Sequence, residues 1–481
     1  MEEREGGSFP VIKMKQKKKR NSFSGSLGFV LAAAGSAVGL GNIWRFPYLA
    51  AKDGGGLFLV IYLILALTFG FTLLTTEVAI GRKTKQSPLT AYSKLSKNWG
   101  FLGVLASLVP MIILPYYCVI GGWVIKYFFA YLTGEGTLAA QDGYFTGYIE
   151  GEVQPIVLML LFLVLVAFIV FRGVNKGIES SSKIIMPLLI LLVIGISVFS
   201  LTISHTDANG VTRNSLEGLK IYLVPDLTGL TITRFFTVLV DAMGQLFFSL
   251  SVAMGIMIAY GSYVSDDANL VQSINRIEIF DTLVAFLAGV MIIPAVYTFM
   301  GNAGMEASGP SLMFVSLPKV FASMGKIGNL IGFLFFAMVL FAALTSAVSV
   351  MEAVVSSIMD KFHMSRIKAA SIETCIALVG GIVVCLGYNR LYFNITLPNG
   401  ANAQILDIMD YISNNCLMPL VAIGTCILVG WIIKPQVIID EAEKTGCKFG
   451  RKKLYIVMIC YIAPVLLLIL FLKSMGVLKA I

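Results

Sequence analysis

Long apolar stretches with almost no charge inside them recur along the whole chain. Many are about 20 residues long, which is the length that a helix needs to cross the apolar core of a bilayer. Most lack the polar stripe that a helix of a soluble protein presents to water. The pattern predicts an all-α polytopic membrane protein with about eleven transmembrane helices. The expected spans are 26–50, 56–81, 99–131, 154–172, 181–203, 233–262, 275–302, 326–361, 367–387, 403–433 and 453–472.

The composition agrees with this prediction and argues against several classes of function. Apolar residues make up 57% of the 481 residues and charged residues only 13%, against about 25% in an average soluble protein. Two histidines argue against histidine-based catalysis or a His-rich metal site, and seven cysteines without a CxxC pair argue against a zinc or disulfide framework. The sequence contains neither an HExxH motif nor a nucleophile elbow, so we do not expect an enzyme.

The basic residues are concentrated in particular loops. Six lie between Lys13 and Arg20, ahead of the first span, whereas the loop 133–152 has no lysine or arginine. By the positive-inside rule, the N-terminus is expected in the cytoplasm, and an odd number of spans places the C-terminus outside. We therefore interpret the net charge of +9 as a sign of plasma-membrane topology rather than of a nucleic-acid partner. Residues 1–25 lack an apolar core and a cleavage site, so we expect a cytoplasmic segment and no signal peptide.

Two of the expected spans contain small and polar residues at about mid-membrane depth. Residues 35–42 read GSAVGLGN, with three glycines, and residues 249–255 read SLSVAMG. Glycine lowers helix stability by about 1 kcal/mol relative to alanine. Close packing of helices through small residues would explain one such stretch. Two of them, five spans apart, favour broken helices around a central binding site between inverted repeats.

The residues from Gly35 to Tyr48, GSAVGLGNIWRFPY, closely resemble the signature of the neurotransmitter:sodium symporter family. The resemblance continues through KGIE at 176–179, Met186-Pro187, GQLFFSLS at 244–251 and ALTS at 343–346. It covers the first ten spans in order, and eleven spans with short outer loops are similar to the prokaryotic amino-acid transporter branch.

The resemblance implies a leucine-transporter-type fold, a 5+5 inverted repeat with broken helices 1 and 6. The implied parts are 1–25, a basic cytoplasmic segment; 26–203, the first five-helix repeat; 204–232, an outer loop; 233–433, the second repeat; 434–452, a cytoplasmic loop; and 453–481, helix 11 and the C-terminus.

The resemblance also implies binding sites for two Na⁺ ions, built from oxygen atoms, which hard cations prefer. The first site would use the Ala37 carbonyl, Asn42, Ser249, Asp281 and the substrate carboxylate. The second would use the carbonyls of Gly35, Val38 and Ala342 with the hydroxyls of Thr345 and Ser346. Taken alone, the last two hydroxyls would more often serve helix packing.

Asp281 departs from the leucine-transporter pattern, which has asparagine at this position and a glutamate four residues later, where this chain has Ala285. Chloride-dependent relatives have a serine at the later position and bind the anion nearby. A carboxylate inside the membrane costs roughly 3 kcal/mol or more unless it is partnered, so Asp281 is a functional candidate. We expect it both to bind sodium and to supply the negative charge that chloride supplies in those relatives, so that chloride is not required.

Gly39 occupies the position at which monoamine carriers of the family have an aspartate that pairs with the substrate amine. Glycine leaves room for a substrate with its own carboxylate, near the Leu40 and Gly41 amides, the Tyr117 hydroxyl and sodium. The expected cargo is a neutral, mainly apolar L-amino acid, since the pocket offers no charged side chain. The expected pocket residues are Ser36, Ala37, Leu40, Gly41, Ile113, Tyr117, Phe248, Ser249, Ser251, Met254, Ser346 and Val350. Without the resemblance, the apolar ones would be read as ordinary helix packing.

By the same resemblance, gates on both sides of the pocket are expected. Arg45 and Asp410 correspond to the outer pair, and Tyr117 with Phe248 to an aromatic lid. Arg20, Ser262, Tyr263 and Asp360 correspond to the inner network, although Arg20 is also explained as a topology residue. Gly177 and Pro187 bracket a stretch of span 5 whose helix is expected to open locally.

The leading hypothesis is therefore a sodium-driven amino-acid symporter that works by alternating access. A transporter-like sensor or channel without concentrative transport is the alternative class, and a proton-coupled carrier is the alternative among transporters, because Asp281 can take up a proton. The expected partners are the amino acid and the lipid bilayer, and the oligomeric state is left open.

Overall fold

The computed structural model describes residues 22–207, 210–304 and 309–478, and these residues are almost entirely helical. Within these ranges, nine helices are long and apolar enough to cross a membrane: Gly56–Thr84, Lys97–Leu132, Gln154–Phe171, Val174–Ser200, Leu270–Asn302, Lys326–Phe362, Arg366–Leu386, Ile405–Ile432 and Lys452–Ser474. A tenth span is a pair of helices bent by 52°, Ser26–Ala37 and Gly41–Lys52.

The sixth expected span, which supplies the eleventh membrane crossing, is also interrupted. Residues 233–262 fold as two helices, α12 (Ile232–Ser249) and α13 (Ile256–Ser262), with a non-helical segment between them. Counting this pair as one span gives the predicted number of about eleven. The seventh span begins at Leu270, earlier than the expected residue 275, and the Asn269 side chain caps its first turn by accepting a hydrogen bond from the Gln272 amide at 3.0 Å.

The helices that make up the spans are often joined by short π-helical turns. They are α1 (Ser26–Ala37), α2 (Phe46–Lys52), α3 (Gly56–Leu65), α4 (Phe71–Thr84), α6 (Gly100–Leu132), α9 (Gln154–Phe171), α10 (Ser180–Ser200), α14 (Leu270–Gly304), α17 (Lys326–Phe362), α18 (Arg366–Leu386), α19 (Ile405–Asp410), α20 (Met418–Ile427), α22 (Lys452–Val457) and α23 (Ala463–Ser474). The π-helical turns are Gly41–Arg45, Ala66–Gly70, Val174–Glu179, Leu312–Ser316, Tyr411–Leu417, Leu428–Ile432 and Met458–Ile462.

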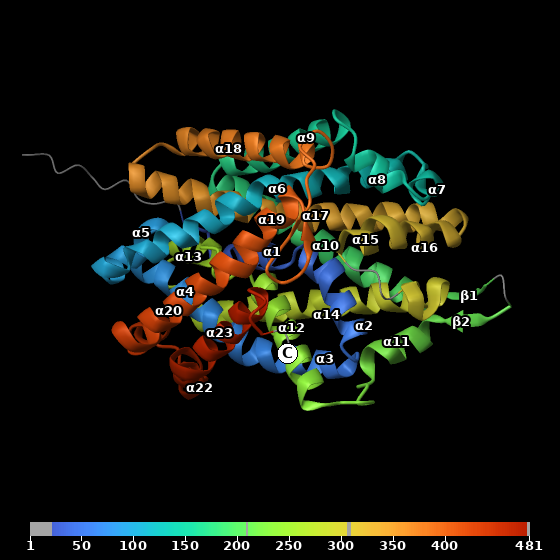
Figure 1. The fold of residues 1–481 in the computed structure, drawn as a ribbon. Helices are drawn as coiled ribbons and strands as arrows, with labels where there is room; N and C mark the ends of the chain where they lie inside the picture. The colour runs from blue at the N-terminus through green and yellow to red at the C-terminus, as the bar shows by residue number, and fades with distance from the viewer. Residues whose placement is uncertain (1–21, 208–209, 305–308, 479–481) are drawn as a thin grey trace, which may run out of the picture.

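Short elements gather at the two ends of the helical body (Figure 1). One end carries α7 (Gly136–Ala139), α8 (Tyr144–Ile149), α11 (Ser215–Leu223), α15 (Gly309–Ser311), α16 (Leu317–Ser323) and the hairpin of β1 (Ser204–Thr206) and β2 (Thr212–Asn214). The opposite end carries α5 (Pro88–Leu95), a 3₁₀ turn Lys97–Trp99 and α21 (Gln436–Glu443). A second small hairpin pairs β3 (Ile395–Thr396) with β4 (Asn402–Ala403).

The spans differ in how much of their apolar surface faces protein. In α6 and α17, 72% of the most apolar stretch is buried inside the molecule, whereas the corresponding share is 33% in the spans that contain α10 and α23. Apolar side chains on the outer faces, such as Leu191 and Val465, stay exposed because the bilayer, not the protein, covers them. The deeply buried α6 and α17 pack against each other, and α1, the first half of the broken first helix, packs against α17, α14 and α10.

Candidate transport site

The first broken helix opens at the glycine-rich stretch. Helix α1 ends at Ala37, Val38 has an extended backbone (φ −75°, ψ 97°), and a π-helical turn begins at Gly41. The backbone carbonyls at the end of α1 are therefore not all used by helical hydrogen bonds. The break lies where the sequence predicts it.

The second break, between α12 and α13, has three residues in the left-handed region: Ser251 (φ 54°), Ala253 (φ 62°) and Gly255 (φ 73°). For residues other than glycine this conformation costs roughly 1–2 kcal/mol each. Two contacts fix it. The buried Glu77 carboxylate accepts a hydrogen bond from the Ala253 amide at 2.6 Å, and the Ser251 hydroxyl donates to the Ser36 carbonyl at 3.0 Å. The second of these contacts ties the two breaks to each other.

A small cavity of about 40 Å³ lies between the two breaks, α6 and α17. All twelve expected pocket residues line it, together with Gly39 and Asn42. Its apolar wall comes from Ile113, Met254 and Val350, and none of its lining residues is charged.

Gly39 marks the tightest point of this cavity. A Cβ atom on Gly39 would lie 2.8 Å from the Ser346 hydroxyl oxygen and 3.5 Å from the Tyr117 hydroxyl oxygen. A larger side chain at this position would therefore displace Ser346 or fill the space beside Tyr117.

Three buried polar side chains form the first ion cluster. The Asn42 amide donates to Asp281 Oδ1 at 2.8 Å and to Ser249 Oγ at 2.9 Å, and Ser249 Oγ donates to the same carboxylate oxygen at 2.7 Å. Asn42 Oδ1 in turn accepts from the Gly39 amide at 3.0 Å. Asp281 Oδ2 is fully buried and has no hydrogen-bond partner among residues 22–207, 210–304 and 309–478. The residues expected at the first sodium site thus lie together, with one carboxylate oxygen of Asp281 left without a hydrogen-bond partner among the described residues.

The second ion cluster is built on Ser346. Its hydroxyl lies 3.4 Å from the Gly35 carbonyl, 3.1 Å from that of Ser36 and 3.4 Å from that of Val38. Thr345 packs against Gly35, but its hydroxyl donates within its own helix, to the carbonyls of Phe341 at 3.0 Å and Ala342 at 3.1 Å. The structure thus brings all five predicted residues together, while the Thr345 bonds are those expected of a packing hydroxyl.

The chain matches the model of the sodium:neurotransmitter symporter family over residues 20–143 and 148–481. The chain belongs to this family. It is therefore a sodium-dependent membrane transporter and not an enzyme.

Individual relatives support the same conclusion. An uncharacterized sodium-dependent transporter of Haemophilus influenzae is 32% identical, and the alignment covers 95% of this chain and 99% of the relative. The Bacillus subtilis transporter YhdH, also uncharacterized, is 34% identical, with coverage of 95% and 98%. The crystal structure of MhsT in complex with L-phenylalanine matches 95% of this chain and all of that chain, with a TM-score of 0.82 and 35% identity. This match confirms the predicted fold class.

On the outer side of the symporter, the expected pair of Arg45 and Asp410 does not form a direct ion pair in the part of the chain that the structure describes. The Asp410 carboxylate instead accepts hydrogen bonds from Tyr116 at 3.1 Å and Asn414 at 2.6 Å. Arg45 lines a cavity of about 540 Å³ toward the outer end. Phe248 lines both this cavity and the small one, so its ring lies between them.

A second outer cluster was missed by the sequence analysis. Asp241 on α12 pairs with Lys52 at the end of α2 at 2.9 Å and with Lys473 on α23 at 3.2 Å, and Lys52 also lies 3.8 Å from Asp53. These four residues come from distant parts of the sequence, and each alone resembles an interfacial charge. Burial raises the pKa of the Asp53 carboxyl to about 6, and the negative charge of Asp241 adds to this effect.

The expected inner network is described only in part. Arg20 lies outside the described residues. Ser262 donates to Ala259 within its own helix, and the Asp360 carboxylate accepts from the Ser87 amide at 2.7 Å. Tyr263 donates to Glu352 at 2.7 Å, and Glu352 receives two bonds from Arg366, at 2.6 and 2.8 Å. The sequence analysis gave Glu352 and Arg366 no role in this network.

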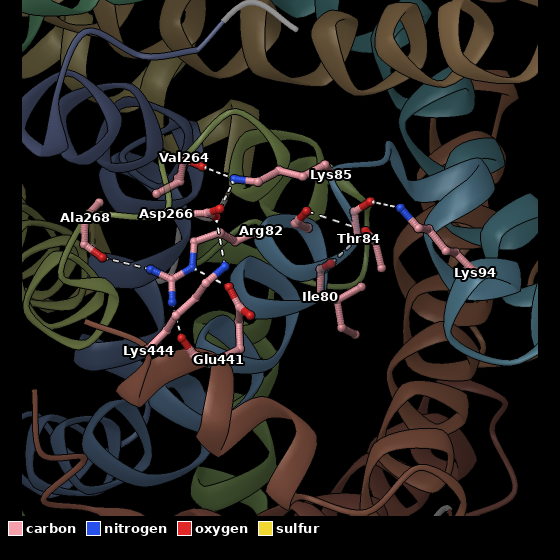
Figure 2. Close-up of polar contacts among 11 residues, drawn as sticks. Ile80, Arg82, Thr84, Lys85, Lys94, Val264, Asp266, Ala268, Glu441 and Lys444 are labelled. Atoms are coloured by element: carbon pink, nitrogen blue, oxygen red, sulfur yellow. Dashed lines mark hydrogen bonds and ion pairs between the residues drawn. The ribbon is translucent and has the colours of Figure 1, made fainter. Parts of the chain in front are cut away.

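A further ionic cluster closes the inner end between α4, α21 and the loop that precedes α14 (Figure 2). The Arg82 side chain is fully buried; it pairs with the Glu441 carboxylate at 2.7 Å and donates to the Ala268 carbonyl at 2.8 Å. Above it, Asp266 pairs with Lys85 at 3.0 Å and Lys444 at 3.2 Å. The hydrogen bond from Lys85 lowers the pKa of the Asp266 carboxyl, and a second hydrogen bond from Lys444 adds to this effect.

Proposed function

We propose that this transporter imports a neutral, mainly apolar L-amino acid together with two sodium ions, by alternating access and without a requirement for chloride. The observation that carries the proposal is the cavity between the two broken helices. Its lining combines backbone at two helix breaks, hydroxyl groups and apolar side chains, and it lacks a charged side chain. Such a lining suits a ligand whose own charges cancel and whose side chain is apolar.

The carboxylate of the cargo has a natural place at the start of the π-helical turn, near Leu40, Gly41 and the Tyr117 hydroxyl. Backbone N–H groups at a helix start are only partly used and favour an anion. Asn42 and Ser249 line the same cavity and also belong to the Asp281 cluster. A sodium ion at that cluster would therefore share ligands with the bound amino acid, which couples the two.

The buried Asp281 supports chloride independence. One of its oxygens binds Asn42 and Ser249, and the other is unpaired, so a fixed negative charge is already available beside the sodium site. Relatives named as sodium- and chloride-dependent, such as the rat taurine transporter at 27% identity, rely on chloride by name. The bound L-phenylalanine in the MhsT structure, at 35% identity, supports an amino acid as cargo.

The direct test has two stages. Purified protein is screened against the twenty amino acids by thermal unfolding, with sodium or with potassium, because a specific ligand raises the midpoint by mass action. The best ligand is then offered, labelled, to proteoliposomes with an inward sodium gradient. Accumulation above equilibrium in sodium but not in potassium supports a symporter. Equilibration only, or binding without flux, supports the channel or sensor alternative, and uptake driven by a pH gradient alone supports proton coupling.

Asp281→Asn tests the role of the fixed charge. We expect this variant to lose uptake or to recover it only when chloride is added, whereas Asp281→Glu keeps the charge and is expected to remain independent of chloride. Uptake by Asp281→Asn that equals the wild type in chloride-free buffer would contradict the assignment.

A further inference from the structure

A long groove of about 690 Å³ opens on the membrane-facing surface between α3, the turn that follows it, and α14. Its rim consists of apolar side chains that the protein leaves exposed, including Leu63 and Leu67 on one side and Ile279 and Leu283 on the other. In a membrane protein such a surface is in contact with lipid chains. The volume of the groove is large enough to hold part of an acyl chain.

The floor of the groove reaches the ion site. Phe46 and Tyr62 line the floor and pack edge to face, with ring centres 4.8 Å apart. The Tyr62 hydroxyl is buried beside Asp281 and Ser249. Thr282, another lining residue, directly follows Asp281 in α14. A chain in the groove would therefore press on the residues that hold the first ion cluster in place.

One end of the groove is polar, and Arg451 closes it. Arg451 pairs with Glu278 at 3.1 Å, donates to Asn275 and to the Leu67 carbonyl at 2.9 Å, and lies 3.4 Å from the centre of the Phe71 ring. The guanidinium is thus fixed by its own partners and neutralised by Glu278, so it caps the groove but is not itself available to an anion.

The chain around this cap carries further positive charge. Lys448, Lys452 and Lys453 flank Arg451, and within the described residues none of the three has an ion-pair partner. Basic residues next to a membrane helix attract anionic lipid headgroups. The three lysines therefore lie close in sequence to the residue that closes the polar end of the groove.

We propose that this groove binds an anionic phospholipid, with one acyl chain over Tyr62 and Thr282 and the phosphate at Lys448, Lys452 and Lys453. A zwitterionic lipid offers the same chains but leaves the three lysine charges uncompensated. Binding of the lipid is independent of the proposed function, whereas its effect on the ion cluster rests on that function: a filled groove holds Asp281 in position and raises sodium affinity.

The binding test uses purified full-length protein in detergent without sodium or amino acid, so that its result does not depend on the transport hypothesis. Dioleoylphosphatidylglycerol and dioleoylphosphatidylcholine are added separately, and the unfolding midpoint and the bound lipid by native mass spectrometry are measured. We expect phosphatidylglycerol to raise the midpoint more, and we expect the difference to shrink at high salt because exposed charges are screened. Equal effects of the two lipids would overturn the proposal.

Two variants locate the site. Leu283→Trp fills the groove and is expected to abolish the phosphatidylglycerol effect, while Leu188→Trp, on the lipid-facing side of α10 with a similar exposure of 43% against 42%, is expected to keep it. Replacing Lys448, Lys452 and Lys453 with glutamine is expected to make the two lipids equivalent, whereas the exposed pair Lys83→Gln and Lys97→Gln is expected to change little. If the phosphatidylglycerol effect survives Leu283→Trp, the lipid binds elsewhere and the proposal is wrong. If Leu283→Trp instead disrupts a dimer, a second copy of the chain covers the groove, and the proposal is also wrong.

The functional consequence is measured separately, as the concentration of sodium at half-maximal binding in vesicles with and without phosphatidylglycerol. A severalfold tighter sodium response in phosphatidylglycerol, lost in Leu283→Trp and kept in Leu188→Trp, is the expected result. An unchanged sodium response together with confirmed lipid binding would overturn the coupling to the ion site but not the lipid site itself.

Discussion

At Gly39 the absence of a side chain leaves space for the Ser346 hydroxyl. The Ser346 hydroxyl, which lies near three carbonyls of the first broken helix, is only 2.8 Å from the place where a Cβ atom of residue 39 would be. This is a steric reason for glycine that the sequence resemblance alone did not provide.

For Gly39→Ala we expect amino-acid affinity to fall about tenfold or more, since overpacking in a well-packed site costs about 1–3 kcal/mol. The measurement is ligand binding in sodium. Gly195→Ala is the matched control, because Gly195 is an exposed helical glycine of α10 with no neighbour within 4 Å of an added Cβ atom. Its binding should be unchanged, and its stability unchanged or slightly higher.

Asp53 makes a prediction about pH. Burial raises the pKa of its carboxyl from 3.8 to about 6, so the folded protein holds this proton more tightly than the unfolded chain does. The carboxyl therefore destabilises the fold increasingly as the pH rises from about 4 to 6. We expect the unfolding midpoint of Asp53→Asn, relative to the wild type, to increase over this range and then to level off. A difference that falls with pH would contradict this.

At the scale of the elements, the two broken helices show what can be derived from sequence. Glycine and serine residues at 35–42 and 249–255 predicted both breaks, because these residue types lower the stability of a helix interior. The contact that holds the second break was not predictable in detail, since Glu77 and Ala253 are far apart in sequence and meet only in the packed structure. The pairs of Arg366 with Glu352, Arg82 with Glu441 and Asp241 with Lys473 were likewise not predictable, because the partners belong to different helices that meet only in the packed structure.

Glu77→Leu is expected to lower the unfolding midpoint and to abolish uptake. It leaves the Ala253 amide without its acceptor in a buried segment, which costs about 1–3 kcal/mol. Glu77→Gln keeps an acceptor oxygen in place and is expected to retain most of the stability. If the two variants were equally stable, the hydrogen bond would not be what holds the break.

At the scale of the whole molecule, ionic clusters join helices at both ends, and the pairs of Arg82 with Glu441 and of Arg366 with Glu352 are the most deeply buried of them. Glu352 is completely buried, and Arg366 is its partner across α17 and α18. In the proposed function, contacts of this kind on the inner side would have to separate before the cargo could leave there.

Arg366→Gln is expected to destabilise the protein by roughly 3–5 kcal/mol, because it leaves a buried carboxylate unpaired. The double variant Arg366→Gln with Glu352→Gln removes both charges and should recover much of this loss, as a double-mutant cycle on unfolding midpoints would reveal. Lys368→Gln, on the exposed side of the same helix, is the control. A double variant as unstable as the single one would contradict the ion-pair explanation.

The position of the Ser346 hydroxyl has one more consequence. It lies at the second ion cluster and also lines the small cavity, so in the proposed function one group serves both ligands. Thermodynamic linkage then requires reciprocity: the factor by which bound sodium raises the affinity for the amino acid equals the factor by which bound amino acid raises the affinity for sodium. Intracellular sodium would thus set how readily the cargo is released, and the cell's ion gradient would regulate unloading as well as uptake.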